Sequence, residues 1–251
     1  MTFRFLAAAG VLALGLASCA GPGVPTGPGA GTGTGNSLHH DTLGHRPGPR
    51  GFNTVIIDAG HGGKDSGAVN NGLREKDLTL DTAKRLQRQL SGKVRTILMR
   101  SDDTFVELDD RVARASGRDG TILLSIHYNS SGSSVRGPET YYWRVDSHGL
   151  ATRIQRATAS VSPVEAGNRG LERRRLRLTR NPDIPCVLAE IGYLSNGSEA
   201  RLCGDPGYRE KMAAALARAI LDQRANGDAG TGPLPPPLNA PPSRGTDAPG
   251  S

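Results

Sequence analysis

Cysteine is scarce in this sequence, with three residues in 251, so a framework of several disulfides is excluded. Aromatic residues make up only 4%, and no apolar run reaches the ~18 residues that a membrane-spanning helix needs. Glycine (34) and proline (17) are plentiful, but they crowd towards the two ends. Residues 51–225 remain as the predicted folded region, which is long enough for one domain with a sizeable core.

Acidic residues are outnumbered, 24 against 31 basic ones, which gives a net charge of +7 and a pI near 9.7. This balance indicates an anionic partner. Composition alone does not distinguish a nucleic acid from a membrane surface or an acidic polymer.

The N-terminus predicts export. Arg4 precedes a mostly apolar stretch, Phe5 to Ala17, which has the length of the hydrophobic part of a secretory signal. The stretch ends in Leu-Ala-Ser-Cys, with the cysteine at Cys19, and resembles the lipobox of bacterial lipoproteins. We expect residues 1–18 to be a signal peptide and Cys19 to be lipidated, anchoring the protein in the bacterial cell envelope. The alternative is an ordinary signal peptide with an incidental cysteine.

Two segments have the composition of disordered chain. Residues 19–50 are rich in Gly, Pro and Thr, and residues 226–251 contain three consecutive prolines. We expect a tether before the domain and a disordered tail after it. His39, His40 and His45 lie in the tether, where solvated side chains are favoured over a metal site.

Between these segments, short β-branched runs alternate with helical periodicity. Strands are expected at residues 54–58, 94–99, 122–127, 139–143 and 186–190, and helices near 80–90, 150–161 and 208–220. This alternation predicts an α/β domain: a mostly parallel twisted sheet with helices on both faces.

Three of the predicted strands lead into a histidine or a glutamate. His61, His127 and Glu190 each lie at the end of a strand, where open α/β sheets collect their ligands. Glu75 lies in the first turn of the following helix. Imidazole and carboxylate groups are the ligands of catalytic zinc, which takes three protein ligands. With four candidates, one carboxylate can be a ligand and the other a general base.

Each of these residues also has a simpler explanation. A histidine at a strand end is commonly a hydrogen-bonded surface residue, and a glutamate at a helix start is favoured by the helix dipole. Other readings of the motifs fail: Lys64 is followed by Asp65, where a phosphate-binding loop needs Ser or Thr. No G-x-S-x-G nucleophile motif occurs. Cys186 is predicted to be buried, and its spacing from Cys203 permits a disulfide without requiring one.

Four segments together resemble the zinc-dependent N-acetylmuramoyl-L-alanine amidases of the type-3 family. These segments are VIIDAGHGG (55–63), LREKD (73–77), SIHYN (125–129) and LAEIGYLSN (188–196). The resemblance implies that His61, Glu75 and His127 bind zinc and that Glu190 is the catalytic carboxylate. The implied reaction is hydrolysis of the amide between N-acetylmuramic acid and L-alanine in peptidoglycan. Ala59 replaces the usual Pro and Met99 the usual Thr, and neither is a carried-over ligand.

Further expectations follow from that resemblance. Asn129, Arg169 and Arg173 are candidate substrate contacts, and other arginines follow at 174, 175, 177 and 180. A solvated basic face is the alternative reading of this arginine cluster. The partner is expected to be peptidoglycan and not nucleic acid, and the protein a monomer. Only 42 residues separate His127 from Arg169, which leaves no room for an inserted helix that blocks the site.

Two other functions stay open. One is a metal-dependent deacetylase or carboxypeptidase that acts on the same wall. The other is a non-enzymatic, lipid-anchored module that binds the wall through its positive charge alone.

Overall fold

The computed structural model describes residues 48–180 and 182–236. The predicted signal peptide, Cys19, and the three tether histidines lie outside the described residues. No helix among those described combines the length and apolarity that crossing a bilayer requires.

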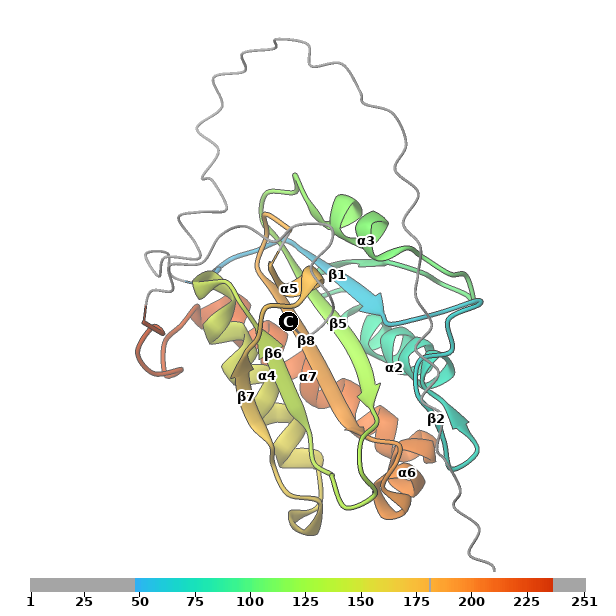
Figure 1. Cartoon of the computed structure of the whole chain (residues 1–251). Coiled ribbons are helices and arrows are strands. Elements are labelled where there is room, and N and C mark those ends of the chain that lie inside the picture. The colour runs from blue at the N-terminus through green and yellow to red at the C-terminus, as the bar shows by residue number, and fades with distance from the viewer. Residues whose placement is uncertain (1–47, 181, 237–251) are drawn as a thin grey trace, which may run out of the picture. The chain divides into compact units, whose positions relative to one another are not determined.

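A six-stranded sheet forms the centre of the domain (Figure 1), in the order β4-β1-β5-β8-β6-β7. The strands are β1 (Thr54–Ala59), β4 (Arg95–Leu98), β5 (Thr121–Asn129), β6 (Glu139–Tyr142), β7 (Gly170–Arg173) and β8 (Cys186–Tyr193). β4, β1, β5 and β8 are parallel, whereas β6 pairs antiparallel with β8 and parallel with β7. The predicted mostly parallel α/β sheet is confirmed. β7 was not predicted from the sequence.

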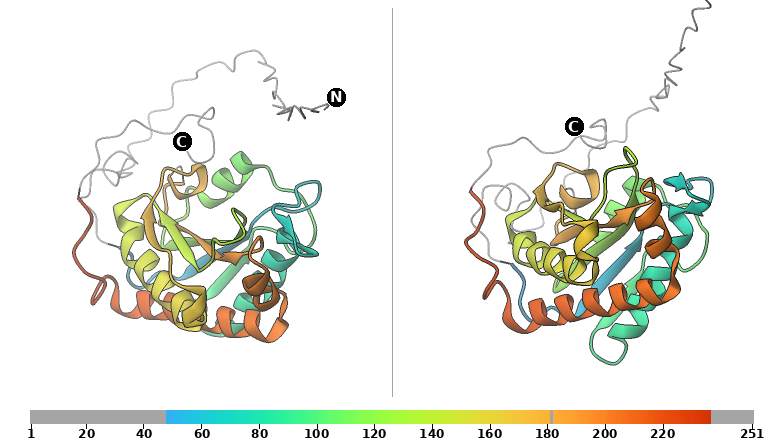
Figure 2. Two further views of the ribbon diagram at one scale, coloured as in Figure 1. Left: turned by 60° about the horizontal axis from the view of Figure 1, so that its bottom comes forward. Right: turned by 90° about the horizontal axis from the view of Figure 1, so that it is seen from below.

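Three long helices cover one face of the sheet, and they contain the three predicted helical segments. They are α2 (Glu75–Leu90), α4 (His148–Val161) and α7 (Pro206–Asn226). In Figure 1 they lie behind the sheet, and Figure 2 shows α7 running along the outside of this layer. Leu86, Ile154 and Leu216 are fully buried in the larger of two core clusters, which fills this side.

The opposite face has much thinner cover. Of the helices in residues 48–180 and 182–236, only the short α3 (Leu108–Ala115) and α5 (Arg177–Arg180) pack there, over a small core cluster. Side chains of β5 alternate between the two faces: Leu124 and Ile126 enter the larger core, and Leu123 the smaller. By this alternation His127 lies on the same thinly covered face as Leu123. The polar side chain of His127 therefore points to the face that the long helices do not cover.

The remaining elements are small. They are the hairpin β2 (Val69–Asn70) and β3 (Leu73–Arg74), the helix α6 (Gly197–Gly204), and the 3-10 turns η1 (Val145–Ser147) and η2 (Val164–Ala166). Between His127 and Arg169 the chain forms β6, η1, α4 and η2. The helix α4 contacts α7 and β6 and belongs to the layer of long helices. Within the described chain, no helix of this interval covers the opposite, thinly covered face of the sheet.

Ordered contacts extend to either side of the predicted domain boundaries at 51 and 225. The backbone N–H of Gly48 donates to Asp228 at 2.7 Å, and Arg153 donates to the carbonyls of Gly227 and Ala229. Cys186 and Cys203 are both free and buried, in different core clusters, so no disulfide joins them.

Candidate metal centre

Three predicted ligands meet at the carboxyl ends of β1 and β5. His61 lies in the loop after β1, Glu75 is the first residue of α2, and His127 lies near the end of β5. One ligand atom from each lies within 4.8 Å of the others. No second group of this kind occurs among residues 48–180 and 182–236. The structure therefore brings together the ligand set that the sequence predicted.

The Glu75 carboxylate is the centre of this group. Its Oε1 lies 3.0 Å from His61 Nε2 and 2.9 Å from His127 Nδ1. The backbone N–H groups of Tyr128 and Ala68 also donate to it, at 3.0 and 2.8 Å. These bonds hold the Glu75 side chain, which extends from the start of α2, within reach of the ends of β1 and β5.

Asp65 orients His61, a role that was not predicted for this residue. Its Oδ2 lies 2.9 Å from His61 Nδ1, and its Oδ1 accepts from Gly67 N. A carboxylate on Nδ1 fixes the proton there and leaves Nε2 free as a ligand. The signal was an aspartate four residues after His61 in a glycine-rich loop.

Two glycines allow the close approach of these groups. A Cβ on Gly60 would lie 2.4 Å from His127 Cε1. A Cβ on Gly67 would lie 2.4 Å from Glu75 Oε2, and the φ of +60° at Gly67 independently favours glycine. The loops after β1 thus need glycine where they pass the ligands.

Glu75 and His127 stabilise each other's charged forms. Burial alone would raise the pKa of Glu75, but hydrogen bonds with His127 and His61 outweigh it and hold this pKa well below its usual range. Burial lowers the pKa of His127, yet the bond and charge of Glu75 reverse this and raise it to about 9. Glu75 is therefore ionised at neutral pH, and a bound metal would replace the proton that His127 holds beside it.

Glu190 lies beside the group without belonging to it. It is paired in register with His127 across β5 and β8, and its Oε2 is buried with no hydrogen-bond partner. Burial raises the pKa of Glu190 to about 7; the charge of His127 opposes this and that of Glu75 adds to it. A carboxyl group with a pKa near neutrality exchanges protons readily in both directions.

A cavity of about 330 Å³ opens between these groups and the thin cover of α3 and α5. His61, His127 and Asp58 line one side of it. The other walls are mainly apolar: Phe105, Val106, Leu108, Leu176, Leu178 and Leu188. The cavity gives a ligand access to the metal group from the thinly covered face.

The N-acetylmuramoyl-L-alanine amidase family model matches residues 55–222. The chain belongs to this family.

Curated relatives include the uncharacterized protein YqiI of Bacillus subtilis, 40% identical over 66% of this chain and 82% of YqiI. N-acetylmuramoyl-L-alanine amidase LytC of B. subtilis is 36% identical over 65% of this chain and 34% of LytC. The probable cell wall amidase LytH of Staphylococcus aureus is 36% identical over 67% and 56%, respectively. The chain thus matches about a third of LytC and just over half of LytH.

Solved structures of amidases share the fold. The N-acetylmuramoyl-L-alanine amidase of Clostridium difficile 630 superposes with a TM-score of 0.65 at 31% identity, covering 69% of this chain and 97% of that one. The catalytic domain of CwlV from Bacillus (Paenibacillus) polymyxa gives 0.64 at 37% identity, covering 68% and 97%. The part that is matched is the domain that carries the metal group.

The three predicted substrate contacts of this amidase-family domain, Asn129, Arg169 and Arg173, do not all lie together. Asn129 and Arg169 both contact Tyr193, near the end of β8: Asn129 Nδ2 is 3.3 Å from the Tyr193 hydroxyl, and the Arg169 guanidinium lies over the Tyr193 ring. Arg173 is the last residue of β7 and lies in register with Tyr142 of β6. Its side chain donates to the carbonyls of Trp143 and Pro236. The structure does not bring Arg173 to the metal group.

The other cluster arginines do not form one solvated basic face. Arg177 pairs with Asp109, and Arg180 is buried with its guanidinium over the Trp143 ring. Arg174 lies over the Tyr141 ring. The cluster is therefore divided among separate contacts.

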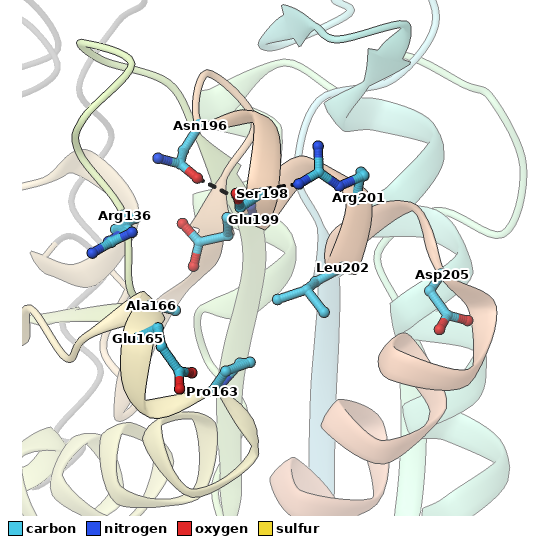
Figure 3. Close-up of a pocket in the computed structure, with 10 residues that line it drawn as sticks. All are labelled: Arg136, Pro163, Glu165, Ala166, Asn196, Ser198, Glu199, Arg201, Leu202 and Asp205. Carbon is cyan, nitrogen blue, oxygen red and sulfur yellow. Dashed lines mark hydrogen bonds between the residues drawn. The ribbon is translucent and has the colours of Figure 1, made fainter.

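A second pocket of about 400 Å³ contains none of the predicted site residues (Figure 3). The acidic side chain of Glu199 points into it between Arg136 and Arg201. Glu199 is buried and accepts from the backbone N–H groups of Gly137 and Tyr193. Its carboxylate ties the loop before β6 to the end of β8, which is a structural role.

Proposed function

We propose that this chain is a zinc-dependent hydrolase that cleaves the amide between N-acetylmuramic acid and L-alanine in peptidoglycan. Membership of the amidase family supports the reaction class. The observation that carries the proposal is the position of Glu190, an unpartnered carboxylate beside the His61–Glu75–His127 group. The group and the carboxylate supply, at one place, the parts that hydrolysis of an amide requires.

The residues fit zinc by their chemistry. Two imidazole nitrogens and one ionised carboxylate within 4.8 Å are the donor set of a three-ligand catalytic site, and Asp65 supplies the outer hydrogen bond to His61. When bound there, zinc polarises a substrate carbonyl and lowers the pKa of water.

The side chains have separate roles in the reaction. Glu190 accepts a proton from the attacking water at its free Oε2 and returns it to the departing L-alanine nitrogen. Its pKa near 7 suits both transfers. The cavity gives the substrate access to His61 and His127, while Asp65 keeps the His61 ring in one orientation.

A deacetylase or carboxypeptidase would use the same groups on another bond. The family match favours the amidase. Digesting purified peptidoglycan and identifying the new amine tests this: a free L-alanine amine is expected, whereas a free sugar amine would identify a deacetylase. A new D-alanine carboxylate product would identify a carboxypeptidase.

A non-enzymatic wall-binding module would need no metal. We expect purified protein to contain about one zinc per chain and to lose activity in a chelator. Full activity of metal-free protein contradicts the zinc mechanism, and wall binding without any hydrolysis supports the binding module.

We further propose that the protein is exported, lipidated at Cys19 and monomeric, acting on the wall from the envelope membrane. The lipobox-like sequence before Cys19 and the cell-wall amidases among the relatives support this. Cys19→Ser is expected to prevent lipid attachment and to shift the protein out of the membrane fraction. Unchanged fractionation and no lipid on the wild type would exclude the anchor.

A further inference from the structure

Glu139 is a buried carboxylate that the mechanism above does not use. It begins β6 and pairs in register with Glu190 of β8, so His127, Glu190 and Glu139 form one row across three strands. Only 3% of Glu139 is exposed. A buried charge of this kind requires dedicated partners.

Those partners are three donors around one oxygen. The hydroxyls of Tyr141 and Tyr193 each lie 2.7 Å from Glu139 Oε2, and Arg169 Nε lies 3.3 Å from it. Burial alone would raise the pKa of Glu139, but these hydrogen bonds lower it below its usual range. The carboxylate is therefore ionised and well ordered.

Arg169 is held on two sides and open on a third. Glu139 binds its Nε, the Tyr193 ring lies 5.3 Å from its Cζ, and 40% of the side chain is exposed. Arg169 donates to Glu139 through Nε, and the Tyr193 hydroxyl also interacts with the guanidinium and helps to raise its pKa. The exposed part of the guanidinium is accessible to an anion from solvent.

We propose that Arg169 binds a carboxylate of the substrate beside Glu190, and that Glu139 is the positioning residue that holds Arg169 there. This inference rests on the proposed amidase function. The carboxylate that fits is the α-carboxylate of the residue after L-alanine in the stem peptide, a D-isoglutamyl group. A guanidinium binds a carboxylate through two parallel hydrogen bonds, whereas the amidated form, D-isoglutamine, offers one acceptor and no charge.

The spacing supports this assignment. The α-carbons of L-alanine and the next residue lie about 3.8 Å apart, which puts the carboxylate about 7–8 Å from the scissile carbonyl. Neighbouring strands are about 4.8 Å apart, so Glu139 is one strand spacing from Glu190. Arg169 Nε lies 3.3 Å from Glu139 Oε2, so its guanidinium is held beside the strand next to Glu190, within reach of a group one residue beyond L-alanine.

The test compares two soluble muropeptides that differ only in a D-isoglutamyl or a D-isoglutaminyl second residue. Wild type is expected to show a KM at least 10-fold lower for the carboxylate form. Arg169→Ala should abolish this preference by raising KM for the carboxylate form about 10-fold to 100-fold, with KM for the amide form changed less than about 3-fold. The kcat should change little, because Arg169 is remote from the scissile bond.

Glu139→Gln tests whether Glu139 positions Arg169. The amide keeps the shape of the side chain and an oxygen that accepts hydrogen bonds from the two tyrosine hydroxyls. It should raise KM for the carboxylate form about 3-fold to 10-fold, and combined with Arg169→Ala it should add little further loss. Arg169→Lys should restore part of the preference. Arg201→Ala removes a positive charge from an exposed position and serves as the matched control, with unchanged kinetics expected.

The outcomes separate the two proposals. If wild type cleaves neither muropeptide, the amidase function fails. If it cleaves both with equal KM, or if Arg169→Ala keeps the preference, the carboxylate subsite is wrong and the amidase function stands. If Glu139→Gln lowers kcat equally for both substrates without changing the preference, Glu139 does not act through Arg169.

Discussion

His127 of β5 and Glu190 of β8 occupy facing positions on neighbouring parallel strands. Backbone hydrogen bonds of the sheet, and not a loop, therefore set the separation of a metal-ligand candidate from the candidate general base. His127 turns to Glu75, at 2.9 Å, whereas the Oε2 of Glu190 has no partner. The same strand pair thus gives one side chain to the metal group and leaves the other free.

The first prediction separates the base from the ligands. Glu190→Gln should reduce hydrolysis at least about 100-fold while zinc content stays near normal, because the side chain is outside the ligand group. His61→Ala, Glu75→Ala and His127→Ala should lose zinc as well. Elemental analysis and a hydrolysis assay check this; a Glu190→Gln protein that retains more than about a hundredth of the wild-type rate contradicts the assignment.

Asp65→Ala should weaken zinc binding about 10-fold to 100-fold, since His61 loses the carboxylate that fixes its ring and its proton. Zinc affinity is measured by competition with a chromogenic chelator, independently of activity. Asp77→Ala is the control, because Asp77 is an exposed carboxylate of α2, the helix that begins with Glu75, and pairs with Arg74 instead of a histidine. Equal affinity of both variants would show that Asp65 has no orienting role.

Gly60→Ala should displace His127. The new Cβ would lie 2.4 Å from the ring, and the backbone is held by a bond from Gly60 N to Ile126 O. We expect a loss of about 1–3 kcal/mol in stability and at least a 10-fold loss of zinc affinity. Gly197→Ala is the control, since nothing lies within 4 Å of a Cβ there. Chemical denaturation measures the stability of both variants, and zinc titration measures their zinc affinity. Equal values for the two variants would contradict the prediction.

The stability of the metal-free protein should depend on pH through Glu190. Its pKa is raised from 4.5 to about 7, so the folded state holds a proton that the unfolded state releases, and stability falls as pH rises between these values. Glu190→Gln lacks this titration. Its stability relative to wild type should therefore increase by about 1–3 kcal/mol from pH 4.5 to pH 8. Urea denaturation in chelator measures this, and a constant difference across the range rejects the raised pKa.

The purified protein should hydrolyse peptidoglycan without an activator. No helix between His127 and Arg169 covers the thin face of the sheet in the described chain. Initial rates with and without envelope extract check this. Negligible hydrolysis that rises strongly on addition of a partner would reveal inhibition of another kind.

Local sequence determined five of the six strands of the main sheet, the three long helices and the candidates for the metal group. The β-branched runs that end in glycine-rich or polar residues predicted β1, β5 and β8, and strand ends in a parallel sheet meet at one edge, which placed His61 and His127 together. Glu75 was a candidate because it lies in the first turn of the helix after the loop. Periodicity and the rule for parallel strands gave four candidates, and the resemblance to the amidase family implied which three of them are ligands.

The tertiary structure alone decided the direction of β6. A parallel strand at residues 139–143 would begin at the opposite edge of the sheet, far from Glu190. Because β6 runs antiparallel to β8, Glu139 begins at the site edge, and β7 then brings Arg169 beside it. Strand direction depends on the path of the connecting chain and on long-range pairing, which no local pattern encodes. The metal group was therefore readable in the sequence, whereas the row from His127 to Glu139 required the fold.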